Sequence, residues 1–172
     1  FVVAHFHYVL FGGASMGLFA GFYHWFPKMT GRMFNEFLGK AHFLLLFIGL
    51  NVSFMPMHEL GLLGMNRRIA LYDIQFQPLN EIATIGAYIL GLSTLPFVIN
   101  IFLSLASGEK VSRNPWRAYT LEWQTSSPPA IENFDGKPVL WAGPYDYGLN
   151  SEEFDFEKVF GDTPTETSSN SK

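Results

Sequence analysis

Cysteine is absent from the sequence, so the chain has no disulfide bond, no thiolate metal ligand and no cysteine nucleophile. Charge is scarce in its first part: residues 1–106 contain five Lys and Arg and four Asp and Glu, against six and eleven in residues 107–172. The negative charge therefore belongs to the tail, and no basic surface for nucleic acid is predicted. We expect two parts, 1–106 and 107–172.

An initiator methionine and a signal-peptide layout are also absent, and the sequence begins inside an apolar run. With 48% hydrophobic and 17% aromatic residues, the chain is more apolar than a typical soluble domain. We interpret it as a fragment of a membrane protein.

Three apolar stretches are each long enough to cross a bilayer, which takes about 20 helical residues. Their predicted helices occupy residues 1–26, 35–63 and 78–106. Pro27 is expected to end the first helix, and Asn35 to cap the second, which Pro56 should kink. The third should begin at Pro78, whose fixed φ suits a first turn, and stop at Gly108. The predicted fold class is all-α, with three transmembrane helices and a C-terminal tail.

The basic residues predict an orientation in the membrane. The first connecting loop carries Lys28 and Arg32, and the tail begins with Lys110, Arg113 and Arg117. Short loops rich in Lys and Arg usually face the cytoplasm. We therefore expect the tail on the cytoplasmic side, and the loop between the second and third helices on the outer side.

Two histidines, His5 and His7, lie in the opening run FVVAHFHYVL. Residues two apart are about 200° apart around an α-helix, so these side chains should point to opposite sides and cannot share one metal ion. Histidines four apart, as in the zinc motif HExxH, do not occur. The pattern fits axial ligands of two separate haems flanking one helix, with Phe6 between them. Packing and proton-relay roles remain alternatives.

Longer motifs carry a family resemblance. The segments FVVAHFHYVL, HWFPKMTGRMFNEFLGKAHF, GLNVSFMPMHELGLLGMNRR and TLEWQTSSPP resemble subunit I of haem-copper cytochrome c oxidases, in unbroken register over residues 1–136. They correspond to the last three transmembrane helices and the tail of that subunit. The resemblance implies that the three helices are the last of a twelve-helix bundle. The tail is more similar to bacterial than to mitochondrial members.

The resemblance implies roles for five residues. His5 corresponds to the axial ligand of the high-spin haem, where oxygen binds opposite a copper ion, and His7 to an axial ligand of the low-spin haem. Phe6 corresponds to the residue between the haems. Arg67 and Arg68 correspond to the pair that contacts haem propionates; the residues alone would favour a solvated or lipid-headgroup pair.

The same resemblance implies the cofactors and partners. Two haems, of haem a type, and copper B are expected. In the family the copper ligands, the other low-spin ligand and a cross-linked tyrosine come from earlier helices, so the fragment alone is not expected to be active. The implied partners are oxidase subunits II and III, cytochrome c or a similar soluble donor, O2 and the lipid bilayer of a bacterial plasma membrane or other energy-transducing membrane. Quinol-oxidising relatives share the AHFH core, so the donor stays open.

The implied function is the reduction of O2 to water with electrons from cytochrome c, coupled to proton pumping, in the catalytic subunit of a terminal respiratory oxidase. The competing interpretation is a non-catalytic three-helix membrane anchor that binds haem b, or a structural membrane subunit. Such an anchor usually holds haem between histidines on different helices, and does not need a pair two residues apart.

Asn66, in MNRR, stands where the family usually has proline in MPRR, which changes the backbone restraint before the two arginines. His42 and His58 are expected to make core hydrogen bonds, although the equivalent of His42 has been placed in a proton or water path in the family.

The tail mixes aromatics with proline, which is typical of an extended segment. From Glu152 it becomes acidic and then rich in Ser and Thr, which predicts disorder.

Overall fold

The structure is a computed structural model that describes residues 1–118, 120–134 and 138. Within these residues it contains helices, turns and one isolated β-bridge, and no β-strand. Three helical stretches are long and apolar enough to cross a membrane. They occupy Val2–Thr30, Glu36–Leu62 and Ile74–Ser107. The predicted all-α fold with three spans is therefore confirmed.

The chain divides into two compact units. The first comprises Phe1–His24 and Phe34–Gly108, and the second comprises Trp25–Met33 and Glu109–Lys172. The second unit thus includes the end of the first span as well as the tail. The division into the parts 1–106 and 107–172 stays a prediction. The two units are defined by how compact they are, and a compact unit need not be a domain that folds on its own.

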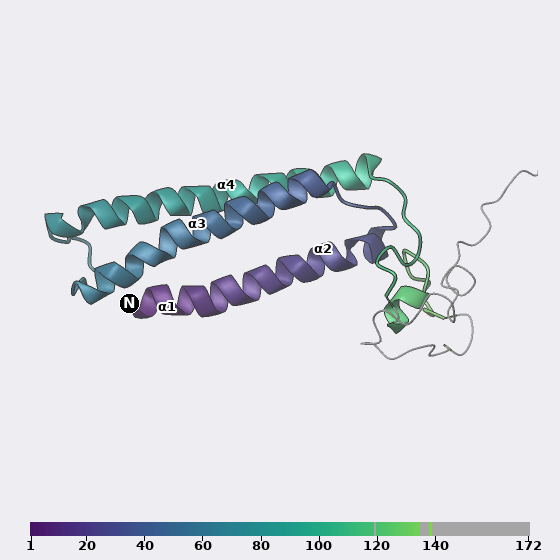
Figure 1. Cartoon of the computed structure of the whole chain (residues 1–172), viewed down its shortest axis with the longest axis horizontal. Helices are drawn as coiled ribbons and strands as arrows, with labels where there is room; N and C mark the ends of the chain where they lie inside the picture. The colour runs from purple at the N-terminus through teal and green to yellow at the C-terminus, as the bar shows by residue number, and fades with distance from the viewer. Residues whose placement is uncertain (119, 135–137, 139–172) are drawn as a thin grey trace, which may run out of the picture. The chain divides into compact units, whose positions relative to one another are not determined.

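The first span has three consecutive helical parts, which are labelled in Figure 1 except for the middle one. These are α1 (Val2–Phe6), the π-helical segment η1 (His7–Ser15) and α2 (Met16–Thr30). A π-helix of this length is rare, and short ones often occur at functional sites. It was not predicted, because an unbroken apolar run has no periodicity that distinguishes a π-helix from an α-helix.

Pro27 does not end the first span, so that prediction was wrong. Helix α2 passes through Pro27 and continues to Thr30. Gly31 ends it instead, with a φ of 68° and an N–H that donates to the Pro27 carbonyl at 2.8 Å. Glycine adopts this left-handed conformation without the steric cost that a Cβ brings, and it is the usual residue just past a helix end. Gly31, just past the end of the helix, was therefore a stronger stop signal than Pro27.

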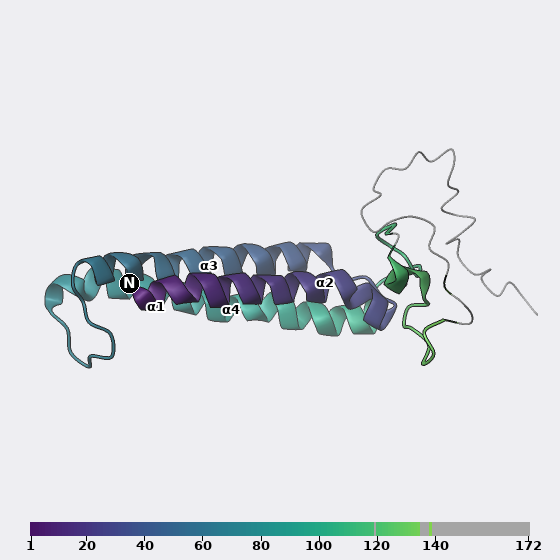
Figure 2. The ribbon, with the colours of Figure 1, turned by 90° about the horizontal axis from the view of Figure 1, so that it is seen from below.

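Helices α3 (Glu36–Leu62) and α4 (Gln77–Ser107) lie side by side over most of their length (Figures 1 and 2). Asn35 caps α3 as predicted, because its side chain accepts a backbone N–H from the first turn at 3.0 Å. Pro78 lies in the first turn of α4 and Gly108 follows its last residue, also as predicted. The kink that Pro56 should cause in α3 stays a prediction.

Glycines bring α3 and α4 into backbone contact. A Cβ added at Gly86 would lie 2.2 Å from the Ser53 nitrogen, and one added at Gly49 would lie 2.7 Å from the Leu90 nitrogen. Small residues at such crossings are typical of paired membrane helices. Because no side chain separates the two backbones there, a shift of one helix must be followed by the other.

The second unit joins the first loop to the start of the tail. Residues 31–33 run antiparallel to residues 109–111, with a bridge between Arg32 and Lys110 and backbone hydrogen bonds of 2.8 and 3.1 Å beside it. A short 3-10 helix, η3 (Leu121–Gln124), follows. The disorder predicted from residue 152 onward lies outside the described residues.

Lys28 is buried in this second unit, with 5% of its surface exposed. Its ammonium group donates to the carbonyls of Arg113 at 2.8 Å, Thr125 at 2.7 Å and Ser126 at 3.4 Å. It also lies 5.2 Å from the ring centre of Trp123, which is the distance of a cation–π contact. Lys28 therefore connects the end of the first span to the tail.

Candidate functional site

His7 is held between two aromatic rings. The Phe6 ring lies 4.4 Å away at 29°, and the Phe54 ring, from α3, lies 4.5 Å away at 15°. His7 Nδ1 is 2.7 Å from the carbonyl oxygen of Val3. A carbonyl oxygen can only accept, so Nδ1 carries the hydrogen and the neutral ring has its lone pair on Nε2. Metal-binding histidines are typically held in this way, with the other ring nitrogen donating to a carbonyl or carboxylate.

His5 has different surroundings from His7, although only Phe6 separates them. The His5 side chain is exposed in this chain, whereas the His7 ring is half-buried against α3. Within the described residues, no group of three or more His, Asp or Glu is close enough to hold a metal ion. Any metal at His5 or His7 would therefore need ligands from a cofactor or from another part of the protein.

A pocket of about 680 Å³ lies beside this start of the first span. It is formed by the beginning of the first span, the end of α3 and the following loop, and its lining includes Phe1, Phe6, Leu60, Arg67, Arg68 and Ile69. Small-molecule sites usually have volumes of about 300–1,000 Å³. The pocket brings together three of the predicted site residues, Phe6, Arg67 and Arg68, while His5 and His7 are not among its lining residues.

The loop that carries the two arginines starts at a tight helix end. The Met65 N–H donates to the Leu60 carbonyl at 3.0 Å, and the Gly64 N–H donates to the Gly61 carbonyl at 3.2 Å, which is a Schellman motif. Gly64 has a φ of 92°, which favours glycine. The direction in which the loop leaves α3 is therefore set by local sequence.

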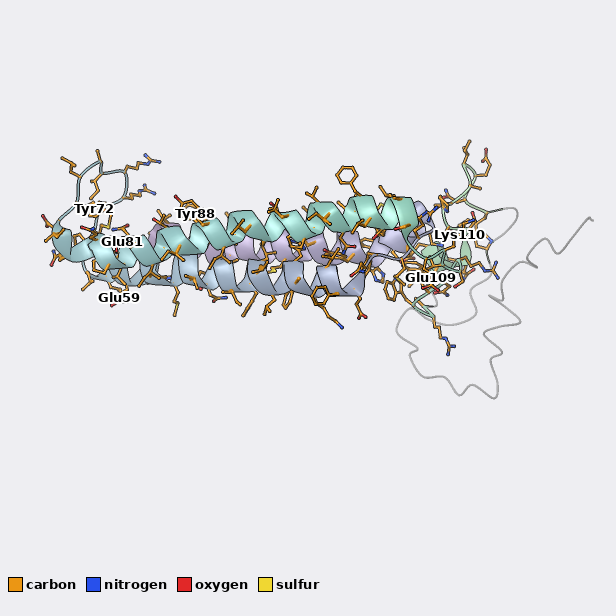
Figure 3. All side chains as sticks on the ribbon, turned by 90° about the horizontal axis from the view of Figure 1, so that it is seen from above. Glu59, Tyr72, Glu81, Tyr88, Glu109 and Lys110 are labelled. Carbon is orange, nitrogen blue, oxygen red and sulfur yellow. The ribbon has the colours of Figure 1, made fainter. Side chains whose placement is uncertain are left out.

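Arg67 and Arg68 are both exposed, so their guanidinium groups remain available to an anion in the pocket. Arg68 has a φ of 62°, an uncommon conformation for a residue with a side chain, of the kind that clusters at functional sites. Figure 3 shows Glu59 and Glu81 at the same end of this unit. The arginine pair supplies two adjacent cationic donors at the pocket.

Asn66 also lines the pocket, so the departure from the MPRR pattern lies within the candidate site. Asn80, from the first turns of α4, lines it as well, and its amide donates to the Phe76 carbonyl at 2.9 Å. The same amide lies 3.5 Å from the Met65 sulfur. Asn80 thus links the loop to α4 just before the two arginines.

Of the other three histidines, His42 makes the core hydrogen bond that was predicted, and the half-buried His58 bonds within its own helix. His42 is 1% exposed, with Nδ1 3.1 Å from the Tyr23 hydroxyl, and its Nε2 has no partner among the described residues. His58 Nδ1 donates to the Phe54 carbonyl at 3.2 Å. A role of His42 in a proton or water path stays a prediction.

Two contacts of His7 were missed by sequence reasoning. Val3 precedes His7 by four residues, so the i−4 relation within a helix offered a signal for it. Phe54 offered none, because it lies on another span and α3 contains several other phenylalanines. Only the packing of the first span against α3 selects it.

The three helices that are long and apolar enough to cross a membrane, together with the family match that follows, make this chain an integral membrane protein. The family model described as "Cytochrome C and Quinol oxidase polypeptide I" matches residues 1–89, which is just over half of the sequence. The chain belongs to this family, as the motifs predicted.

Relatives agree with this assignment. The chain is 70% identical over 159 residues to "Cytochrome c oxidase subunit 1" of Synechocystis sp. and 61% identical over 149 residues to the protein of the same name from Thermostichus vulcanus. It is 48% identical over 140 residues to "Heme-copper oxidase subunit I+III" of Aeropyrum pernix. These alignments cover 92%, 87% and 81% of this chain, but 29%, 27% and 17% of the relatives. The chain therefore spans less than a third of the length of these curated relatives.

Proposed function

We propose that this chain forms part of the catalytic subunit of a terminal respiratory oxidase, which reduces O2 to water with electrons from cytochrome c and couples this to proton pumping. The names of its relatives support the activity and the donor. In the structure, the observation that carries the proposal is the hydrogen bond from His7 Nδ1 to Val3, which leaves Nε2 as a ligand. A haem b anchor is not favoured, because the relatives are oxidase subunits.

His7 is proposed as an axial ligand of the low-spin haem and His5 as the axial ligand of the high-spin haem. The fit rests on donor chemistry: a neutral imidazole with a fixed tautomer is a good ligand for haem iron. The exposed His5 and the half-buried His7 have different surroundings, which agrees with ligation of two separate groups. When bound, haem supplies one-electron and O2 chemistry. Haem a type and copper B, liganded outside this chain, are part of the proposal.

Arg67 and Arg68 are proposed to hold haem propionates, and Phe6 to lie between the haems. Arginine presents a planar fork of donors that matches a carboxylate and keeps its charge at any physiological pH. The pocket beside the two arginines is large enough for part of a haem group and is largely apolar, apart from the arginines and two asparagines. These side chains would neutralise and orient the propionates.

The proposed setting is a multi-subunit complex with oxidase subunits II and III in a bacterial plasma membrane or another energy-transducing membrane. The tail is proposed to lie on the cytoplasmic side. The hydrogen-bonded pairing of residues 31–33 with residues 109–111 supports a common side for the first loop and the tail. Two spans separate them, so both ends return to the same face.

Optical spectra of the native complex test the function. The reduced complex should show two distinct haems, of which one binds CO. In the full-length subunit, His5→Ala should abolish the CO-reactive signal and His7→Ala the low-spin band. A single haem that does not bind CO would contradict the oxidase and favour the anchor. Loss of the same signal in both variants would contradict separate ligation.

A further inference from the structure

The His7 imidazole is held by contacts of two kinds. The Val3 carbonyl and the Phe6 ring belong to the same helical turns as His7, so they move with it. The Phe54 ring comes from α3 and stacks nearly parallel to the imidazole, 4.5 Å away at 15°. Of these three contacts, only Phe54 fixes the imidazole plane relative to another span.

Phe54 is itself firmly placed. It is 9% exposed, and the Phe11 ring lies 6.2 Å from its own ring. Its neighbour Ser53 lies at the backbone contact with Gly86 of α4. Because α3 cannot slide or rotate there without moving α4, the position of the Phe54 ring is set by the helix pair and not by its own rotamer alone.

We propose that Phe54 is a positioning residue that sets the plane of the His7 imidazole and, through it, the electronic structure of the iron that His7 ligates. This inference rests on the proposed role of His7. A ring stacked flat on the imidazole opposes rotation about the Cβ–Cγ bond, because rotation would drive the edge of the imidazole into the face of Phe54. The π orbital of an axial imidazole lies perpendicular to its plane, so the direction of that plane affects the splitting of the iron d orbitals.

A positioning role differs from simple core packing in what it requires of the side chain. Leucine or methionine would fill much of the same volume at modest cost in stability. Neither presents a flat face to the imidazole. Tyrosine does, so a stacked ring is retained in Phe54→Tyr and lost in Phe54→Leu and Phe54→Met.

Electron paramagnetic resonance of the oxidised low-spin haem tests this in the full oxidase complex. Phe54→Leu should keep the low-spin haem but shift and broaden its g values, while the spectrum of the CO-reactive haem stays unchanged. Phe54→Tyr should restore g values close to the wild type. The matched control is Phe47→Leu, which removes an exposed phenylalanine from the same helix, one that stacks on Phe43 instead.

Phe54→Leu with full haem content and wild-type g values would overturn the proposal, and so would an equal shift in Phe47→Leu. If Phe54→Leu does not assemble, Phe54→Met decides by the same measurement. His7→Ala separates this inference from the proposed function. A low-spin signal that survives in His7→Ala would reject His7 as the ligand, whereas unchanged g values at Phe54 alone would reject only the positioning role.

Discussion

At the scale of single residues, Arg67 and Arg68 combine full charge with exposure beside a pocket that also contains Phe6. The attraction between these arginines and an anionic group depends on the surrounding dielectric. Charges in water are strongly screened, and charges in a partly dry site are screened much less. The effect on a haem potential is therefore a direct measure of whether the arginines face propionates.

Replacing Arg67 by Gln should lower the midpoint potential of the nearby haem. The substitution removes a positive charge, so the oxidised and more positive haem is relatively favoured. A unit charge ~10 Å from iron at an effective dielectric of ~20 is worth about 1.7 kcal/mol, or about 70 mV for one electron before salt reduces it. Redox titration of Arg67→Gln, Arg68→Gln and the double variant, at equal haem content, measures the shift.

Lys40→Gln is the matched control for that titration, because it removes an exposed positive charge near the other end of α3. It should leave both potentials unchanged. If the arginine variants also leave both potentials unchanged, the arginines do not face propionates and are a solvated or lipid-facing pair.

Sequence was informative about this site only where the signal was local. The pair His5 and His7 stands out because ionisable residues are costly in membrane segments, whereas Arg67 and Arg68 lie in a loop and were singled out only by the family motif. The partner of the His7 ring, Phe54, does not stand out. Its identity depends on how two spans pack, which the spacing of residues along one helix does not determine.

At the scale of helices, the close contact of α3 with α4 is a property of particular glycines. A Cβ at Gly86 would lie within 3 Å of backbone atoms of Ser53 and Val52, and backbone cannot move aside as a side chain can. Gly91, one turn and a half further along α4, has nothing within 4 Å of an added Cβ. The two glycines therefore have different structural roles on the same helix.

Gly86→Ala should destabilise the helix pair, and Gly91→Ala should not. Alanine is favoured over glycine in a helix by about 1 kcal/mol, so both substitutions gain that amount locally. At Gly86 the gain is outweighed by overpacking, which typically costs about 1–3 kcal/mol or more. The measurement is the thermal loss of haem absorbance in the purified complex. Equal melting temperatures for the two variants would contradict a backbone contact at Gly86.

Helix boundaries could be predicted from the sequence where a capping or turn residue begins or ends the helix through residues close to it in the sequence. Asn35 and Gly108 belong to this class, and the structure confirms both. Pro27 misled the prediction because a proline near a helix end removes one hydrogen bond without forcing the chain to turn, whereas Gly31 adopts the left-handed conformation that does. The π-helix from His7 to Ser15 had no sequence signal.

At the scale of the whole chain, a buried cation, Lys28, helps to join the tail to the first span. Removal of the Lys28 ammonium takes a donor from the carbonyls of Arg113, Thr125 and Ser126, although the Arg113 carbonyl keeps the Ser127 hydroxyl at 3.3 Å. Of the three hydrogen bonds, the one to Thr125 is buried, and a buried carbonyl left unsatisfied costs about 1–3 kcal/mol. This unit was not predicted, because it depends on residues far apart in the sequence whose types are ordinary for a loop.

Lys28→Met should therefore loosen the tail in the intact complex. Methionine keeps the apolar stem but donates no hydrogen bond. Trypsin should cut after Arg113 and Arg117 faster than in the wild type, since the Arg113 carbonyl loses the shorter of its two side-chain hydrogen bonds. Lys110→Met removes an exposed lysine of the same unit and should leave the rate unchanged. A wild-type cleavage rate in Lys28→Met would show that the ammonium group does not hold the tail.

The orientation of the chain in the membrane gives the last prediction. The loop between α3 and α4 and the described part of the tail are separated by one span, so they must lie on opposite faces if α4 crosses the bilayer. The basic residues of the first loop and the tail predict that the tail lies in the cytoplasm. Because this chain has no cysteine, single cysteines can report on each side. Leu71 is 90% exposed in the loop, and Ile131 is 98% exposed in the tail.

Leu71→Cys should react with a membrane-impermeant maleimide on intact spheroplasts, and Ile131→Cys only after the membrane is permeabilised. The variants are made in the full-length subunit with any other cysteines replaced, and both should label fully in detergent. The reverse pattern would move His5 and His7 to the cytoplasmic end of the first span, and the proposed arginine contacts with it. Labelling of both from one side would mean that α4 does not cross the membrane.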